Sequence, residues 1–153
     1  MHSRSDAVHL AASEPGGALY NPLAAAAWSV LFTPAFGAYL VMRNWQALGL
    51  PRQAVHARRW FRASLALLAL QALSAAFNAR VNSQPNLVYW LGLAWLLLWF
   101  VAAALPQALA VRARYGAAWP RRQWDGALLA AVLAGTTYWL SSAAFTALFV
   151  AVT

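Results

Sequence analysis

The sequence predicts an all-α membrane protein with four transmembrane helices arranged as two helical hairpins. Of its 153 residues, 63% are hydrophobic and only 9% are charged, whereas a soluble domain is typically about half apolar and about a quarter charged. Four long stretches are nearly all apolar. The basic residues are all arginines and lie mostly between these stretches, which is typical of helices that cross a bilayer.

A polar N-terminal tail, residues 1–20, precedes the predicted transmembrane domain, which takes residues 21–153. The expected spans are residues 21–42, 60–77, 87–111 and 126–152. Crossing the hydrocarbon takes ~20 predominantly apolar residues, and all four stretches are long enough. The second is the shortest, and Arg62 and Arg80 can extend their charged heads toward opposite interfaces. The tail lacks the basic start and apolar core of a signal peptide, so no cleaved leader is expected.

The first span contains a candidate helix break made of Thr33, Pro34 and Gly37. Pro34 has no amide hydrogen and its ring pushes on the carbonyl of Val30, so it predicts a bend in one continuous helix. The Thr33 hydroxyl can bond back to the carbonyl of Ser29, and Gly37 lets a neighbouring helix approach. The break is either a static kink that shapes the bundle or a working hinge, as in transporters with interrupted helices.

A longer pattern surrounds this break. Residues 32–39 read FTPAFGAY and residues 44–49 read NWQALG. The chain therefore resembles a group of small, poorly characterised bacterial inner-membrane proteins with a Phe-Thr-Pro-x-Phe-Gly-Ala-Tyr-Leu first helix and an Asn-Trp-x-Ala-Leu-Gly turn. The resemblance covers about residues 20–62 and implies a bacterial inner-membrane protein, but no activity.

Turn residues predict the two hairpins. Gly49 closes the first helix and Pro51 opens the second, because glycine is favoured just past a helix end and proline at a helix start. In the second hairpin, Gly116 closes the third span and Pro120 opens the fourth. Asp125 lies near the start of the fourth span, where a carboxylate can satisfy free backbone amides and favour the positive end of the helix dipole.

Small residues recur every four positions in the fourth span. Ala127, Ala131 and Gly135 form a stripe that permits close helix packing, within the chain or between chains. The amides that lie well inside the spans are Gln71 and Gln107, which we expect to bridge helices.

The arginines predict the orientation. The loop between the first two spans holds Arg43, Arg52, Arg58, Arg59 and Arg62, and the loop between the last two holds Arg112, Arg114, Arg121 and Arg122. Segments on the other side are nearly neutral. The positive-inside rule places both arginine-rich loops in the cytoplasm. For a bacterial inner-membrane protein with four spans, both termini would then be periplasmic.

Arginine and tryptophan gather in these loops. The candidates for contact with a partner protein or with anionic lipid head groups are Trp45, Arg52, Arg58, Arg59, Trp60, Arg121 and Arg122. Both residue types are enriched at binding hot spots. They are equally typical of a membrane interface, where arginines set topology and tryptophan rings anchor helices. The positive charge is explained by the membrane, so no nucleic-acid partner is expected.

No catalytic, metal or cofactor site is expected. The middle of every span lacks Asp, Glu, Lys, Arg and His, which proton-coupled transport and intramembrane proteolysis require. The chain has no cysteine, and its histidines lie outside the spans without ligand spacing, so haem and metal sites are not expected. Asp125 is the sole carboxylate near the membrane, and a paired-carboxylate mechanism needs two. Chemistry on lipid phosphates held by arginines is the remaining enzymatic possibility.

Two functions fit these observations. The first is a small polytopic protein that acts through protein–protein contact, as an accessory subunit of an envelope complex or as an immunity protein against a membrane-targeting toxin. Compact spans, a core without ionisable groups and extensive apolar faces favour it. The alternative is a homo-oligomeric channel or carrier for a small solute. The Pro34 break, the arginines at the cytoplasmic mouth and the hydroxyl-rich fourth span support that alternative.

Overall fold

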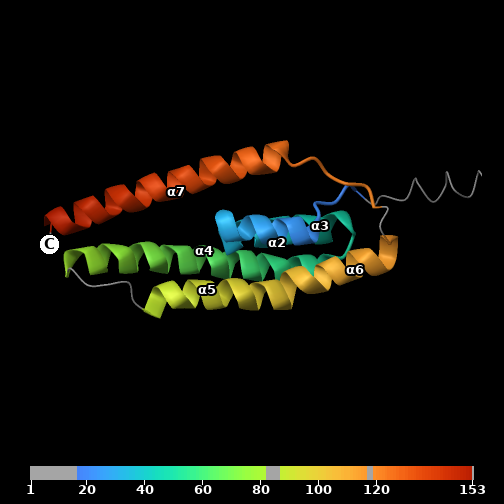
Figure 1. The fold of residues 1–153 in the computed structure, drawn as a ribbon, viewed down its shortest axis with the longest axis horizontal. Coiled ribbons are helices and arrows are strands. Elements are labelled where there is room, and N and C mark those ends of the chain that lie inside the picture. The colour runs from blue at the N-terminus through green and yellow to red at the C-terminus, as the bar shows by residue number, and fades with distance from the viewer. Residues whose placement is uncertain (1–16, 82–86, 117–118, 153) are drawn as a thin grey trace, which may run out of the picture.

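The protein is helical throughout the part of the chain that the computed structural model describes, which is residues 17–81, 87–116 and 119–152. The elements are α2 (Pro22–Leu31), α3 (Pro34–Ala47), α4 (Pro51–Arg80), α5 (Leu87–Trp99), the π-helical turn η1 (Phe100–Ala104), α6 (Leu105–Tyr115) and α7 (Asp125–Val152) (Figure 1). Outside the helices, these residues contain one isolated β-bridge, between Leu19 and Arg121. The predicted all-α class is confirmed.

Three helical segments are long and apolar enough to cross a membrane. They are α4 (Pro51–Arg80), the run through α5, η1 and α6 (Trp90–Tyr115), and α7 (Asp125–Val152). The shortest has 26 residues and is therefore about 38 Å long at ~1.5 Å per residue, against a hydrocarbon thickness of ~30 Å. These helices identify a membrane protein. A fourth span is not confirmed.

The first predicted span is not one kinked helix. Helices α2 and α3 are antiparallel and the chain reverses at Phe32 and Thr33. The backbone N–H of Tyr20, just before α2, donates to Oδ1 of Asn44 near the end of α3 (2.9 Å), and Nδ2 of Asn44 donates back to the carbonyl of Tyr20 (2.8 Å). Figure 1 shows the reversal partway along α4. The prediction of a single bent span over residues 21–42 is therefore wrong.

The residues that predicted a bend instead start a new helix. Thr33 has an extended backbone, and its hydroxyl accepts a hydrogen bond from the backbone N–H of Phe36 (3.4 Å). Pro34 takes the first helical position, where its missing N–H has no intrahelical partner to lose. The expected bond from Thr33 to the carbonyl of Ser29 is absent, because Ser29 belongs to the helix that has already ended. Together, Thr33 and Pro34 cap α3.

Gly37 allows the close approach predicted for it. It is buried in α3, and a Cβ built on it would overlap both the hydroxyl of Ser29 on α2 and the indole ring of Trp99 on α5. Trp99 has no exposed surface and belongs to the buried cluster that also contains Ala38, Val41 and Ala104. The α2–α3 hairpin and α5 therefore meet at a glycine.

Most of the predicted helix ends are confirmed. α3 ends at Ala47 and Gly49 follows with φ 68°; α4 begins at Pro51. Gly116, with φ 64°, caps α6. Pro120 does not open the last helix, because the segment around it runs beside the N-terminal segment: Leu19 N–H donates to the Pro120 carbonyl (2.9 Å) and Arg122 N–H to the Leu19 carbonyl (2.9 Å). α7 begins five residues later, at Asp125.

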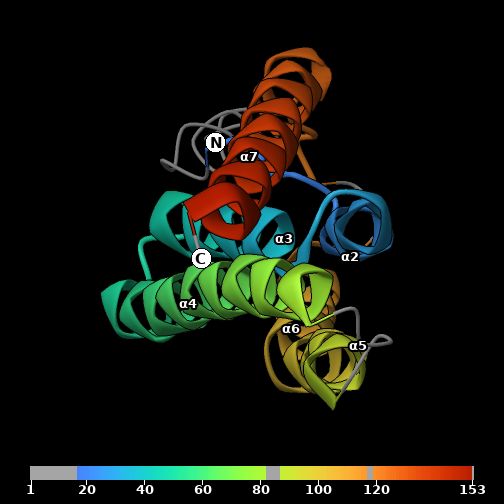
Figure 2. The same ribbon diagram turned by 90° about the vertical axis from the view of Figure 1, so that its left-hand side faces the viewer.

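The predicted arrangement of four spans in two hairpins is not confirmed. α3 does pack along α4 after the Gly49 turn, but the predicted first span is not a single helix. The second hairpin, between the third and fourth spans, is not confirmed. α7 packs mainly against α4, whereas α5, η1 and α6 pack against α2, α3 and α4. Figure 2 shows α7 and α6 on opposite sides of the α3–α4 pair.

The first and last described residues lie at opposite ends of the molecule. The bridge to Arg121 places Leu19 at the end of the molecule that holds Gly49, Gly116 and the start of α7, which we call the arginine end. The C-terminal end of α7 lies at the opposite end (Figure 1). The prediction that both termini are periplasmic assumed four crossings. Residues 1–16 and 153 lie outside the described chain, and the placement of the termini stays a prediction.

Candidate functional site

Two hollows flank the point where the α2–α3 hairpin reverses. The larger is a cleft of about 1440 Å³ between α7 and the helices α3 and α4. The smaller is a mostly apolar pocket of about 260 Å³ between the reversal, α4 and α5, which we call the polar pocket because Ser29, Thr33, Ser64 and Gln71 are among its lining residues. Phe32 and Thr33 line both, and Pro34 lines only the smaller one. Of the predicted break residues, Thr33 therefore lies between the two cavities. Gly37 lines neither and serves packing.

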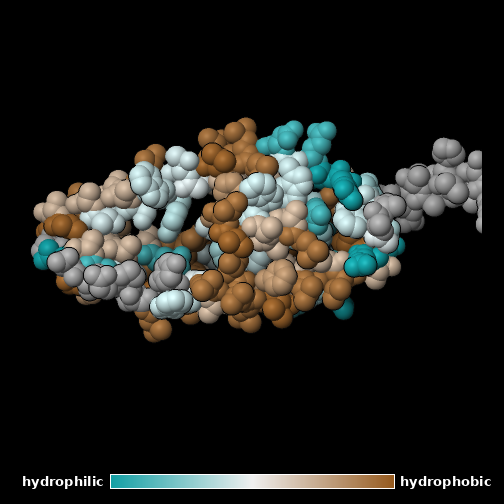
Figure 3. Space-filling model, viewed as in Figure 1, coloured by the Kyte–Doolittle hydropathy of each residue, from teal (hydrophilic) through white to brown (hydrophobic). Residues whose placement is uncertain are grey.

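Small residues form the α7 wall of the cleft. The wall includes Gly126, Ala127, Ala130, Ala131, Ala134 and Gly135. Among these, Ala131 is buried, but a Cβ built on Gly126 or Gly135 would meet no atom within 4 Å. Within the stripe predicted for helix packing, Ala131 is buried whereas Gly135 has open space beside it, and the packing role of the stripe stays a prediction. In Figure 3 gaps separate α7 from the helices beneath it.

A hydrogen bond joins the two walls of the cleft at its inner end. The Tyr138 hydroxyl on α7 donates a hydrogen bond to the backbone carbonyl of Leu68 on α4 (3.0 Å). This bond joins the two helices where the cleft ends, because Tyr138 and Trp139 are the last α7 residues that line it. The opposite wall is apolar and aromatic, with Phe36, Tyr39 and Phe61 among its members.

Three arginines stand at the other end of the cleft. Arg43 lies on α3, and Arg121 and Arg122 lie in the segment before α7. All three line the cleft and are exposed. The Arg122 guanidinium lies over the ring of Tyr20 (5.3 Å to the centroid) and that of Arg121 over Trp119 (5.6 Å). Such contacts hold a guanidinium in place while leaving its N–H groups free to bind anions. We call these three residues the arginine mouth.

Buried amides fix the backbone that carries the mouth. Besides binding Tyr20, Asn44 Nδ2 donates to Oε1 of Gln107 on α6 (3.0 Å), and Gln107 Nε2 donates to the carbonyl of Val41 (2.8 Å). Asn44 is 1% exposed and Gln107 is fully buried. The prediction that Gln107 bridges helices is confirmed. The role of Asn44 was missed, although an asparagine inside an apolar helix is itself a signal, because its buried amide needs partners.

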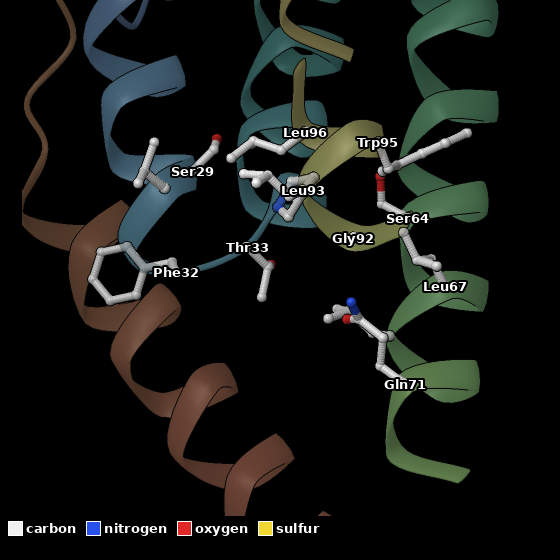
Figure 4. A pocket seen from close by; sticks show the side chains of 13 residues that line it. Ser29, Phe32, Thr33, Ser64, Leu67, Gln71, Gly92, Leu93, Trp95 and Leu96 are labelled. Atoms are coloured by element: carbon white, nitrogen blue, oxygen red, sulfur yellow. The ribbon is translucent and has the colours of Figure 1, made fainter. Parts of the chain in front are cut away.

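Side chains from the α2–α3 hairpin, α4 and α5 line the polar pocket. Ser29 and Thr33 come from the hairpin, and Ser64 and Gln71 come from α4. Ser64 Oγ accepts a hydrogen bond from Nε1 of Trp95 (3.0 Å). Figure 4 shows Thr33 and Gln71 on opposite sides of the pocket. The Gln71 amide packs on α5 at Gly92, where a Cβ would overlap it, so Gln71 lies between α4 and α5 as expected of a bridging amide.

The predicted contact residues do not form one surface. Trp45 and Trp60 pack against the buried cluster, and the Trp60 ring also contacts that of Trp95 at a tilted angle, with 4.9 Å between ring centroids. Arg121 and Arg122 belong to the arginine mouth. Arg52, Arg58 and Arg59 lie exposed on the first part of α4, a separate region of the same end.

Exposed residues on α4 follow a helical repeat. Arg52, Val55, Arg59 and Arg62 are three or four residues apart and therefore share one face. All four are exposed, while Ala54 and Ala57 on the other side of α4 are buried. α4 is continuous from Pro51, so this face, which we call the α4 stripe, is held on a regular helix.

A π-helical turn, not predicted from the sequence, lies in the third span. At η1 the backbone N–H of Leu105 donates to the carbonyl of Phe100, five residues back. Pro106 has no N–H to offer to Ala102, and one wider turn accommodates this missing bond. Pro106 was the signal in the sequence that could have found the turn.

Among the described residues, no group of three or more His, Cys, Asp and Glu side chains could hold a metal ion. No protein family, curated protein or solved structure matches this chain.

Proposed function

We propose that the protein acts through contact with another protein, as an accessory subunit of an envelope complex or as an immunity protein against a membrane-targeting toxin. The observation that carries this proposal is the α4 stripe. An exposed row of arginines with Val55 among them, on a regular helix, is suited to docking, because arginine is enriched at interface hot spots and a rigid helix loses little entropy on binding.

The charge of the stripe indicates the partner's chemistry. Asp125 is the only carboxylate in residues 17–81, 87–116 and 119–152, and it lies on α7 rather than on α4. Arg52, Arg59 and Arg62 therefore lack a counter-charge on their own helix. A partner segment that presents Asp or Glu beside an apolar side chain for Val55 complements this surface.

The test compares two pairs of arginines at the same end of the molecule. Replacing Arg52 and Arg59 with glutamine should lower recovery of the copurifying partner roughly tenfold, as expected for the loss of interface arginines. Replacing Arg112 and Arg114 with glutamine removes the same charge from exposed positions on α6 and should leave recovery unchanged. Equal losses from both pairs, or no loss from either, would contradict docking at the α4 stripe.

The same proposal includes an orientation. We place the protein in the bacterial inner membrane with the arginine end in the cytoplasm, because arginine-rich segments are retained there. Three spans and the α2–α3 hairpin, which enters and leaves at the arginine end, replace the four-span arrangement. Leu19 then lies on the cytoplasmic side and the end of α7 on the periplasmic side.

A channel or carrier for a small solute is the second candidate, and the polar pocket favours it. The α2–α3 reversal brings the end of one helix and the start of another to the middle of the bundle, beside Ser64 and Gln71. Interrupted helices bind solutes in this way in several transporters. Vesicles that contain the protein should then pass small polar solutes faster than empty vesicles, and Gln71→Leu should abolish the difference. Equal rates with and without the protein would remove this candidate.

A further inference from the structure

The cleft beside α7 has the depth of one membrane leaflet. Its α7 wall runs from Gly126 to Trp139, which is about 20 Å at ~1.5 Å per residue. One leaflet contributes about half of the ~30 Å hydrocarbon core, and the remaining length reaches the head-group level. A transmembrane segment of a partner would need the whole thickness, but the Tyr138–Leu68 hydrogen bond closes the cleft partway.

The wall chemistry calls for an apolar occupant. Phe36, Tyr39, Phe61 and Leu65 face the small residues of α7 across the cleft. An empty space of about 1440 Å³ would deprive these side chains of dispersion contacts, and an apolar space of this kind does not hold ordered water well. Hydrocarbon chains fill such a space.

The mouth chemistry calls for an anion. Arg43, Arg121 and Arg122 all line the cleft, together with Tyr20 and Gln123, and the end of the cleft that they share would lie at head-group level. Asp125 is the one described carboxylate nearby, against three guanidinium groups. Guanidinium groups bind phosphate with paired, charge-assisted hydrogen bonds.

We propose that the cleft binds one anionic glycerophospholipid of the leaflet at the arginine end, with its acyl chains between α7 and the α3–α4 pair and its phosphate at the arginine mouth. The lipid fills the space between α7 and the α3–α4 pair along the first half of α7, where the cleft separates these helices. This site does not use the α4 stripe, and its occupancy is independent of the protein partner.

The test uses the full chain in phosphatidylcholine vesicles that contain a small fraction of photoactivatable phosphatidylglycerol, with the reactive group near the end of one acyl chain. Labelling should fall on residues that line the cleft, such as Phe36, Leu65 and Ala130. Photoactivatable phosphatidylcholine should label the cleft far more weakly. Replacing Arg43, Arg121 and Arg122 with glutamine should weaken phosphatidylglycerol binding roughly a hundredfold, since each basic residue contributes about fivefold near an anionic lipid.

Two matched controls separate this site from general lipid contact. Glutamine at Arg52, Arg58 and Arg59 removes the same charge from the α4 region and should leave the labelling unchanged. Ala130→Trp fills the cleft and should abolish labelling by either lipid, whereas Leu133→Trp, at an exposed position of α7 that does not line the cleft, should not. Both glutamine variants are checked for orientation with a reporter fused after Gly49, and only correctly oriented molecules are compared.

Three outcomes would overturn the proposal. Equal labelling of the cleft by the anionic and zwitterionic lipids would show that the arginine mouth selects nothing. No labelling of the cleft by either lipid would show that α7 closes onto α3 in a bilayer. A copurifying polypeptide that crosslinks to Ala130 and displaces the lipid label would show that the cleft takes a protein segment.

Discussion

The α2–α3 hairpin and α7 are both rich in alanine and glycine, yet they are buried to very different extents. In α3, half of the fourteen residues are buried, including Ala35, Gly37 and Ala38. In α7, Ala131 is the one buried residue among those described. Small residues allow close helix contact in both cases. Neighbouring helices contact α3 closely, whereas the cleft separates much of α7 from α3 and α4. The same composition therefore accompanies a packed interface in α3 and a mostly unpacked face in α7.

The largest effect we expect concerns orientation, and it tests whether the hairpin turns back while α7 crosses. Periplasmic reporters fused after Val152 should be active, and cytoplasmic reporters fused after Gly49 and Gly116 should be active. These results are all-or-none because three crossings place the two ends of the described chain on opposite sides. Periplasmic activity at Gly49 would contradict the arginine rule. Cytoplasmic activity after Val152 would require a fourth crossing.

The second prediction compares matched glycines. Gly37→Ala forces a methyl group into the Ser29 hydroxyl and the Trp99 ring, and overpacking of this kind costs about 1–3 kcal/mol. Gly135→Ala adds the same methyl group where nothing lies within 4 Å, so we expect no loss and a small gain in helix propensity. Thermal unfolding in mild detergent measures both. Similar destabilisation by the two variants would show that α7 is packed as closely as α3.

The third prediction compares polar groups in the two regions. Asn44→Ala removes three hydrogen bonds and leaves buried groups of Tyr20 and Gln107 without partners, at a cost of about 2–3 kcal/mol for unsatisfied buried groups. The Thr137 hydroxyl on α7 donates only to the Leu133 carbonyl of its own helix. Thr137→Ala should therefore change stability by less than ~0.5 kcal/mol. A small loss for Asn44→Ala in the same unfolding assay would mean that the arginine mouth is not held by these amides.

The sequence predicted the long helices and most of their ends, because these depend on local signals. Apolar stretches, Gly49 with Pro51, and Gly116 each specify structure within a few residues. It did not predict the chain reversal. Thr33 and Pro34 are compatible with a kinked helix and equally with a cap followed by a first turn, and the apolar windows of α2 and α3 merge into one apparent span. What decides between the two is the pairing of Tyr20 with Asn44, 24 residues apart.

The candidate site was predicted in its parts and not in its arrangement. Arg121, Arg122 and the stripe from Ala127 to Gly135 were identified as contact and packing residues, yet nothing local shows that they face Arg43 and α3 around one cleft. Trp45 and Trp60 were identified as contact residues because tryptophan is common at interfaces. In the structure they are partly buried and pack against the core cluster, since indole rings pack on a core as readily as they face a lipid head group.

The smallest expected effect comes from the residue that first suggested a break. If Pro34 formed a kink within one helix, replacing it with alanine would straighten that helix and change its packing. As the first residue of α3 it only presets the backbone for a helix that Thr33 already caps, so Pro34→Ala should cost well under ~1 kcal/mol, the usual scale of such changes. Thr33→Ala removes the cap and should cost about 1 kcal/mol. Unfolding in detergent measures the loss of stability in each variant. The α2–α3 hairpin predicts the larger loss for Thr33→Ala, whereas a single kinked helix predicts the larger effect for Pro34→Ala. If solute flux is found in vesicles, unchanged flux in Pro34→Ala would further exclude this proline as a moving hinge.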